Sequence, residues 1–476
     1  MKGTVRPGVA HRAKPGRTDA RTYWQLNMPI FSIFILLIVL APLPFGMVYA
    51  VTQAVFACLV MGLVVCYCVA RLKQKKGTAV PLGWIRPEAV GFFLVLAWGV
   101  VQIGTFSPSA WHHPLWPEAG RALGLDIAGS IGLARGAGFE MLMRMLTYGA
   151  VFWLALQFGR DRKRAGQLLA AVILAAVVYS AYGLVIKFGG FGTVLWIERV
   201  SAERNVTGTF INRNNFATYV GFALLVLCGF YMAGFLKTLE SGRRGRDLAL
   251  NLLQQAFVRG APQLAGMLIL LTALFLTNSR AGVTATLAAL VVLVTLMGPL
   301  RRMAGGFHRL LTLTVLAAVF GIFLLSGEGW IERLTATDLD REMRLKRYDQ
   351  TWQAINHAPL TGYGAGSFQQ AFPMFADERT VNSFKVHNDW LETMFELGIP
   401  AAAVWFLVLG GLGLRCLIGF FRRGRDYVYP AAGFCACVLV GIHSFVDFSL
   451  QIPAVAVTFA VILGVGVVQS RSSLEE

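Results

Sequence analysis

A histidine, an asparagine and an aspartate stand in a row, as His387, Asn388 and Asp389, near the start of the sequence VHNDWLETMFELGIP. The apolar residues that follow predict a helix that begins near His387 and stops at Gly398. The positive end of a helix dipole disfavours a charged imidazole, and a neutral imidazole can act as a general base. His387 is therefore a candidate catalytic base whose ring Asp389 or Glu392 would orient. The alternative is a structural histidine bonded to a loop carbonyl.

Two arginines, Arg213 and Arg280, lie beside apolar segments in the sequences FINRNNFA and TNSRAG. An arginine held against a membrane interior without a partner costs about 3 kcal/mol or more, and its planar guanidinium suits phosphate and carboxylate groups. Two such groups on the same face as His387 could clamp a diphosphate, although a lone arginine would more simply reach the lipid headgroups. The polar residues that could support these three are Asn212, Asn214, Asn215, Ser279, Asn388, Asp389 and Glu392.

A third candidate for contact with an anionic substrate is Arg347, which shares one side of a predicted helix with Arg341 and Arg344. Substrate contact and simple exposure to water are equal alternatives for this arginine. The glycine-rich sequence GYGAGSF that follows predicts a tight turn. It is not a dinucleotide-binding fingerprint, because no strand precedes it and no acidic partner follows at the required distance.

The composition excludes an ordinary soluble protein. Of the 476 residues, 56% are hydrophobic and 14% are charged, whereas soluble domains are about 25% charged. Repeated apolar runs long enough to cross a bilayer predict an all-α polytopic membrane protein with about twelve spans. The predicted spans lie near residues 29–44, 47–70, 87–105, 141–159, 165–188, 213–236, 262–278, 281–299, 309–326, 398–420, 429–446 and 451–469. Pro42 and Pro44 leave open a re-entrant hairpin in place of the first two.

Basic residues cluster in the N-terminal tail and after every second predicted span. This alternation predicts that both termini are cytoplasmic, and it explains the net charge of +18 better than binding to nucleic acid does. The expected organisation is a cytoplasmic tail, nine spans, a periplasmic catalytic loop with short helices, three spans and a second cytoplasmic tail. These parts cover residues 1–28, 29–326, 327–397, 398–469 and 470–476.

The seven cysteines all fall in or at the ends of apolar segments. Pairs of the form Cys-x-Cys occur at Cys66/Cys68 and Cys435/Cys437. Their helical spacing and apolar surroundings favour inert packing thiols over a metal site. No metal or other cofactor is therefore expected.

Five segments in this order resemble the O-antigen ligase-related family of membrane glycosyltransferases, which have a GT-C-like architecture. Members of this family include lipopolysaccharide O-antigen ligases, Wzy-type polysaccharide polymerases and protein O-oligosaccharyltransferases. The resemblance spans roughly residues 30–469 and rests on GTFINRNNFATYVGF (208–222), LTNSRAGVTATLAAL (276–290), APLTGYGAGSF (358–368), VHNDWLETMFELGIPAAAVWF (386–406) and HSFVDFSLQIP (443–453).

The resemblance implies a metal-independent transfer on the periplasmic face of the bacterial inner membrane. The donor would be an undecaprenyl-diphosphate-linked glycan, and the acceptor would be lipid A-core or another lipid-linked glycan. Arg213 and Arg280 would hold the diphosphate, and His387 would activate the attacking hydroxyl. Direct displacement would invert the configuration at the anomeric carbon. Ligase and polymerase remain open alternatives, and polysaccharide assembly proteins are possible partners.

Three other functions remain as alternatives. The first is a protein O-oligosaccharyltransferase, and the second is a scaffold of a polysaccharide assembly complex. The third is a multi-span transporter, which would place functional polar residues in the middle of the membrane on broken helices. Asp447 and His443, near the end of a late span, are the residues that would fit such a transporter.

Overall fold

The computed structural model of the chain describes residues 17–74, 78–198, 205–239, 241, 244–298, 337–383 and 385–471. Over these residues the fold is helical, apart from a short antiparallel ribbon of β1 (Thr193–Val194) and β2 (Ile197–Glu198). A helix satisfies its own backbone hydrogen bonds, which the interior of a bilayer requires. The expected all-α membrane architecture is confirmed.

Seven helical segments within the described residues are long and apolar enough to cross a membrane, or eight if a bent pair forms one span. The seven are α2 (Ala50–Lys73), η2 with α3 (Leu82–Ile103), α5 (Arg135–Gly159), α6 (Arg162–Phe188), α7 (Arg213–Leu239), α10 (Arg280–Met297) and α16 (Ile399–Arg422). The bent pair joins α8 (Gly245–Leu253) and η4 (Gln254–Arg259) to α9 (Ala261–Leu276) at an angle of 56°.

Three further apolar helices are shorter than 18 residues. They are Met28–Leu40 within α1 (Arg17–Leu40), α17 (Val428–His443) and α18 (Pro453–Val468). Apolar helices therefore lie at every predicted span except 309–326, which falls outside the described residues. Because a straight span needs about 20 apolar residues, the count of twelve spans stays a prediction.

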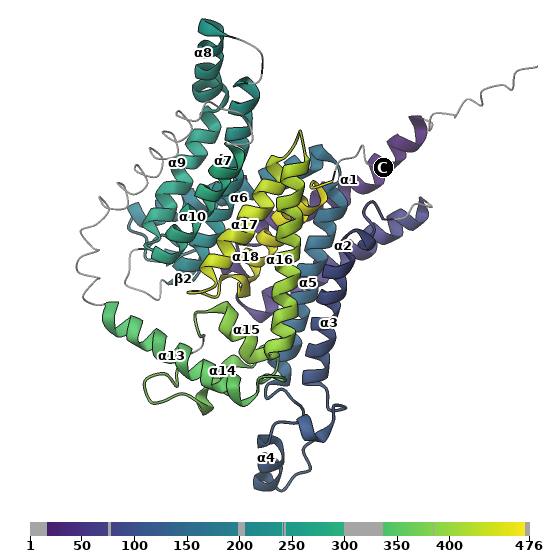
Figure 1. Cartoon of the computed structure of the whole chain (residues 1–476), viewed down its shortest axis with the longest axis vertical. Coiled ribbons are helices and arrows are strands. Elements are labelled where there is room, and N and C mark those ends of the chain that lie inside the picture. Colours follow the sequence, from purple (N-terminus) through teal and green to yellow (C-terminus); the bar gives the residue numbers. More distant parts are fainter. Residues whose placement is uncertain are drawn as a thin grey trace, which may run out of the picture.

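Helix α18 lies at the centre of the bundle, and all its residues are buried. It packs against α5, α16 and α17, and Figure 1 shows α17 and α18 between α16 and α5 on one side and α7 and α10 on the other. Small residues permit the close approach of helices within a membrane. A Cβ on Gly464 would lie 2.8 Å from the Cβ of Ala155, and one on Gly466 would lie 3.0 Å from the Cα of Gly433.

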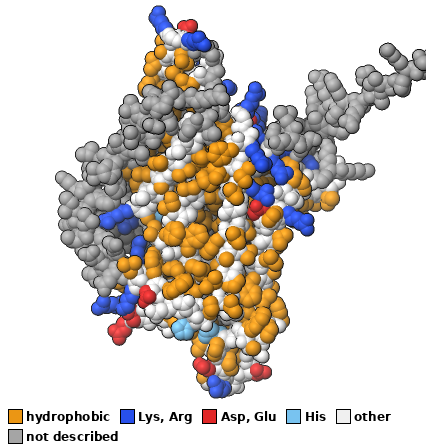
Figure 2. All heavy atoms as spheres, viewed as in Figure 1, with side chains coloured by type: hydrophobic (Ala, Val, Ile, Leu, Met, Phe, Trp, Pro, Cys, Tyr) orange, Lys and Arg blue, Asp and Glu red, His pale blue; other side chains and the backbone are white. Residues whose placement is uncertain are grey.

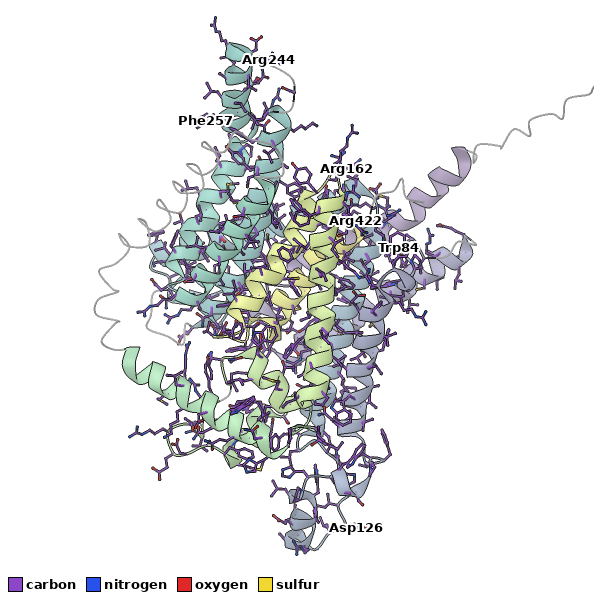
Figure 3. The ribbon with its side chains drawn as sticks, in the orientation of Figure 1. Trp84, Asp126, Arg162, Arg244, Phe257 and Arg422 are labelled. Atoms are coloured by element: carbon purple, nitrogen blue, oxygen red, sulfur yellow. The ribbon has the colours of Figure 1, made fainter. Side chains whose placement is uncertain are left out.

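The two ends of the bundle differ in charge. Arg162, Arg244 and Arg422 lie at one end in Figure 3, where Figure 2 also shows lysine and arginine side chains gathered. The opposite end carries α13 (Thr337–His357), α14 (Phe368–Ala371) and α15 (Asp389–Leu397), and beyond them α4 (Leu115–Leu123) (Figure 1). We call these the basic end and the α15 end. Apolar side chains cover the surface between them in Figure 2.

Helix α15 is fixed to the bundle by a glycine turn and by α3. The turn has positive φ at Gly362, Gly364 and Gly366, as GYGAGSF predicted. Gln102 of α3 donates to the carbonyl oxygen of Glu396 over 2.8 Å and accepts from the backbone N–H of Ala365 over 3.1 Å. These buried bonds join the end of α15 and the glycine turn to α3.

Gly398, which ends α15, provides a test of this junction. Its φ is +79°, and a Cβ there would lie 2.4 Å from the carbonyl oxygen of Leu360. We expect Gly398→Ala to destabilise the protein by about 1–3 kcal/mol, because it adds both backbone strain and a clash. Thermal unfolding in detergent measures this change. Gly410→Ala is the control, because its Cβ meets no heavy atom within 4 Å; equal melting temperatures for both variants would contradict the expectation.

Candidate active site at the α15 end

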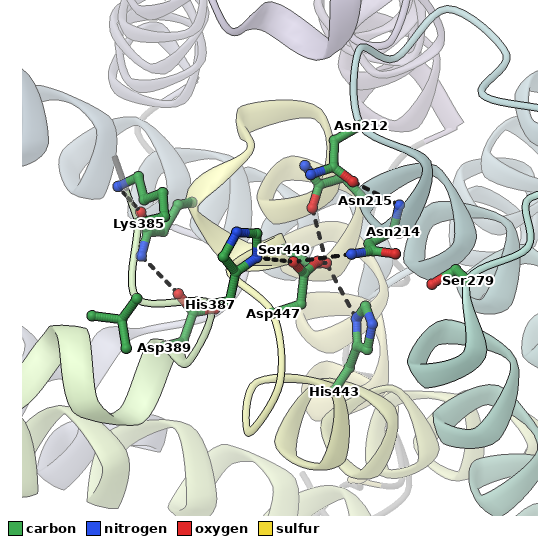
Figure 4. Close-up of polar contacts among 12 residues, drawn as sticks. Asn212, Asn214, Asn215, Ser279, Lys385, His387, Asp389, His443, Asp447 and Ser449 are labelled. Atoms are coloured by element: carbon green, nitrogen blue, oxygen red, sulfur yellow. Dashed lines mark hydrogen bonds and ion pairs between the residues drawn. The ribbon is translucent and has the colours of Figure 1, made fainter. Parts of the chain in front are cut away.

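A buried aspartate, Asp447, connects three distant parts of the chain at the α15 end (Figure 4). Its Oδ1 lies 3.4 Å from Nδ1 of His387 and 3.5 Å from Nδ2 of Asn214, and its Oδ2 accepts a 2.8 Å hydrogen bond from Ser449. Burial raises the pKa of Asp447, but the hydrogen bond from His387, the nearby His443 and the bond from Ser449 outweigh burial and lower it. Asp447 is therefore a buried carboxylate held in its charged form.

His387 precedes the N-cap of α15, as its sequence predicted. Its backbone has φ +62°, and its ring lies edge-on to Phe448 with 5.0 Å between ring centroids. The hydroxyl of Tyr348 on α13 donates to the carbonyl oxygen of His387 over 2.9 Å. With Nδ1 facing Asp447 and about a quarter of the side chain exposed, Nε2 is the ring nitrogen that can meet a substrate.

The expectation that Asp389 or Glu392 orients the imidazole is wrong. Among the described residues, the carboxylate that contacts the ring is Asp447. Glu392 instead pairs with Lys385, whose Nζ lies 2.7 Å from its Oε1, and Asp389 accepts a 2.8 Å hydrogen bond from Gln451. Both acids belong to helix α15, which turns them toward the bundle, whereas His387 lies before the helix and faces the other way (Figure 4).

On the side of α15 that faces the bundle, two buried carboxyl groups have raised pKa values. Burial and the neighbouring Glu392 raise the pKa of Asp389 to about 8 and that of Glu396 to about 7. Burial lowers the pKa of Lys385, but Glu392 and Glu396 raise it by more. Near neutral pH, Asp389 is therefore mostly uncharged, and Glu392 serves as the partner of Lys385.

The three predicted asparagines lie around the first turn of α7. Asn214 contacts Asp447 as described above, and Asn215 accepts a 3.1 Å hydrogen bond from Ser449. Asn212 accepts a 2.8 Å bond from the backbone N–H of Asn214 and so caps the start of the helix. The turn that carries Arg213 is thus tied directly to the aspartate that contacts His387.

The two predicted arginines begin neighbouring helices. Arg213 is the first residue of α7, and Arg280 is the first residue of α10. A Cβ on Gly282 would lie 2.5 Å from the Cβ of Ala217, so the two helices touch within about one turn of both arginines. The structure thus brings both helix starts to the α15 end beside Asp447.

The remaining predicted residues contact backbone groups at the starts of helices and in the loop before α15. Ser279 caps α10 by accepting from the N–H of Gly282 over 3.2 Å, and Asn388 caps α15 by accepting from the N–H of Leu391 over 3.1 Å. Nη1 of Arg347 lies 3.5 Å from the carbonyl oxygen of Lys385. Arg347 therefore touches the loop that carries His387.

Sequence reasoning assigned Asp447 and His443 to the rival transporter and missed Ser449, Thr218 and Tyr348. Thr218 and Nδ1 of His443 lie 2.7 Å apart, and Thr218 donates to Ser449 over 2.9 Å. The available signal was the run of polar residues in HSFVDFSLQIP, between two apolar segments. This cluster begins at the last residue of α17 and continues into the loop after it, not on a helix broken in mid-membrane.

Metal ligands do not gather in the part of the chain that the structure describes. Within it, no group of three or more His, Cys, Asp or Glu residues could hold a metal ion. All seven cysteines lie within the apolar helices, and all are free thiols.

An all-helical bundle with apolar sides and a polar cluster at one end defines a multi-span membrane protein with a candidate active site at the rim of its bundle. Residues 265–406 match a family model described as O-antigen ligase. This match supports an O-antigen ligase-related family, as the sequence motifs indicated, and glycan transfer of the ligase or polymerase type in general. No curated protein matches the chain significantly.

Proposed function

We propose that the protein transfers a glycan from an undecaprenyl-diphosphate donor to a glycan acceptor, without a metal ion. The observation that carries this proposal is the contact of Asp447 with both His387 and Asn214. Through it, a candidate base lies beside the helix start that carries Arg213. This combination is what displacement of a lipid diphosphate by a sugar hydroxyl requires.

In this mechanism Asp447 is a positioning residue. It holds Nδ1 of His387, so that Nε2 accepts the proton of the attacking hydroxyl, and its charge stabilises the imidazolium that forms. The oxygen then attacks the anomeric carbon from the side opposite the diphosphate. The bond to the leaving phosphate oxygen breaks, and the configuration at the anomeric carbon inverts.

Arg213 and Arg280 take the diphosphate in this proposal. The negative charge on the leaving group grows as the glycosidic bond breaks, and guanidinium groups that already face it lower the barrier. Both arginines start helices, whose N-terminal N–H groups also favour anions. Asn212 and Ser279 keep those helix starts in position.

The proposed location is the bacterial inner membrane, with both termini in the cytoplasm and the α15 end facing the periplasm. Membrane proteins keep their lysines and arginines in cytoplasmic loops, and the basic end would be that side (Figure 3). The acceptor would be lipid A-core for a ligase or a second lipid-linked glycan for a polymerase.

The variant His387→Ala removes the proposed base. Without the base, transfer from an undecaprenyl-diphosphate glycan should fall by about 10²–10⁴-fold. The assay uses purified protein in detergent with either lipid A-core or a lipid-linked glycan as acceptor. Product on lipid A-core identifies a ligase, and a ladder of longer lipid-linked chains identifies a polymerase. His357→Ala is the control, since that histidine is exposed on α13; near-normal transfer by the His387 variant would refute the proposed base.

The variant Asp447→Asn preserves the shape of the buried side chain and removes its negative charge. The amide cannot stabilise an imidazolium, so kcat should fall by about 10²-fold or more. Binding of undecaprenyl diphosphate should stay unchanged, because Asn214 can still donate to the amide oxygen. A variant that keeps its kcat and loses only donor affinity would show that Asp447 does not act through His387.

The variant Arg280→Lys keeps the positive charge and removes the planar set of hydrogen-bond donors. We expect kcat to fall by about 10²-fold, since one point charge cannot bind two phosphate oxygens in the plane that the guanidinium offers. Steady-state kinetics with the lipid-diphosphate donor measures this change. Arg246→Lys, on exposed α8 at the basic end, is the matched control. Equal rates for the two lysine variants would argue against the diphosphate clamp.

A further inference from the structure

A hollow of about 170 Å³ at the basic end is lined by three arginines and a tryptophan. Arg415 and Arg422 belong to the last turns of α16, and Arg471 follows α18. Trp84 belongs to η2 (Leu82–Ile85), which leads into α3. Trp84 and Arg422 are labelled beside each other at this end of the bundle in Figure 3. Three segments that are far apart in the sequence thus bring positive charge to one place.

The ring of Trp84 contacts two guanidinium groups. Cζ of Arg471 lies 4.8 Å from the ring centroid, and Cζ of Arg160 lies 4.9 Å from it. The face of an aromatic ring attracts a cation, and a guanidinium stacked on a ring is restricted in its position. Arg471 is therefore held at the hollow by Trp84.

The positive charge of the hollow exceeds its negative charge. Nε of Arg415 lies 2.5 Å from Oε1 of Glu88, so this pair is close to neutral. The lining of the hollow contains no acidic side chain, and among the described residues no carboxylate forms an ion pair with Arg422 or Arg471. Guanidinium groups in this state suit a phosphate group, which accepts several of their hydrogen bonds at once.

An apolar cavity of about 420 Å³ continues from the hollow toward the α15 end, between α3, α5, α16 and α18. Ile85 lines both spaces. Leu412 of the apolar cavity lies three residues before Arg415 of the hollow, so one face of α16 lines both. The two spaces together have a basic end and an apolar body.

The apolar cavity opens on the side of the bundle. Phe93 of α3 and Leu146 of α5 line it, and these side chains are 55% and 43% exposed. Both helices are long and apolar enough to cross a membrane. The opening would therefore face lipid, and a hydrocarbon chain could enter without passing through water.

We propose that the hollow and the apolar cavity together bind one anionic phospholipid. Its phosphate lies among Arg415, Arg422 and Arg471, and one acyl chain occupies the apolar cavity. Basic pockets between membrane-spanning helices bind the heads of anionic lipids in this way. The site lies at the opposite end of the bundle from His387 and does not depend on the proposed glycan transfer (Figure 1). The bound lipid joins the end of α16 to the segments beside α3 and α18.

Binding of phospholipids to the purified full chain in detergent tests this site, with native mass spectrometry as the measurement. We expect dioleoyl phosphatidylglycerol to bind about tenfold more tightly than dioleoyl phosphatidylcholine, because only the first has a net negative charge. Inorganic phosphate in excess should not displace it, because phosphate has no acyl chain. Equal affinities for the two lipids, or displacement by inorganic phosphate, would overturn the proposal.

The double variant Arg422→Gln/Arg471→Gln removes two positive charges from the hollow. It should weaken the binding of phosphatidylglycerol about tenfold or more, since each arginine near a membrane surface contributes about fivefold in affinity for an anionic lipid. The matched control is Arg246→Gln/Arg259→Gln, which removes two charges from exposed positions of α8 and η4 that line neither space. Equal losses in the two double variants would show attraction by the overall charge of the basic end, and would overturn the site.

The position of the acyl chain is tested separately. Phosphatidylglycerol with a photoreactive group near the end of one acyl chain should label α3 or α5, around Phe93 and Leu146. This labelling should fall in the Arg422→Gln/Arg471→Gln variant and persist in the control. Labelling that is unchanged in both double variants would mean that the chain does not enter the cavity from the hollow, and would overturn the proposal.

Discussion

The organisation of the α15 end depends on one buried carboxylate. Removing a charged carboxylate from water is costly unless hydrogen bonds replace its hydration. Asp447 obtains these bonds from His387, Asn214 and Ser449, which belong to the loop before α15, the first turn of α7 and the segment before α18. Those three segments can satisfy the carboxylate only when they are assembled around it. The carboxylate that orients the imidazole is thus also the one that joins the start of α7 to the segment before α18.

The features that the sequence predicted correctly are the helices and turns that local patterns determine. Apolar runs located the helices, the glycines of GYGAGSF indicated a turn, and the helix from Asp389 to Leu397 was expected. Local patterns could not reveal the partner of His387, because Asp447 lies 60 residues away and three helices separate them. Asp389 and Glu392 seemed better partners only because they are close in sequence. Helical geometry turns both of them to the other side of α15, toward Gln451 and Lys385.

The part of the chain that matches the O-antigen ligase family model does not contain the whole candidate site. Residues 265–406 include Arg280 and His387, but Arg213, Asn214 and Asp447 lie outside them. The matched region therefore supplies the proposed base and one guanidinium, while Asn214 comes from α7 and Asp447 from the loop after α17. Helix α10, which carries Arg280, packs against both α7 and α17.

The hydroxyl of Tyr348 on α13 has one proton and two acceptors, the carbonyl oxygens of His387 at 2.9 Å and Phe445 at 3.3 Å. It joins helix α13 to the loop that carries His387 and to the segment that leads to Asp447. Tilting α13 away from the bundle must strain or break that shared bond. A force applied to α13 from outside the protein would therefore reach the backbone of the loop that carries His387.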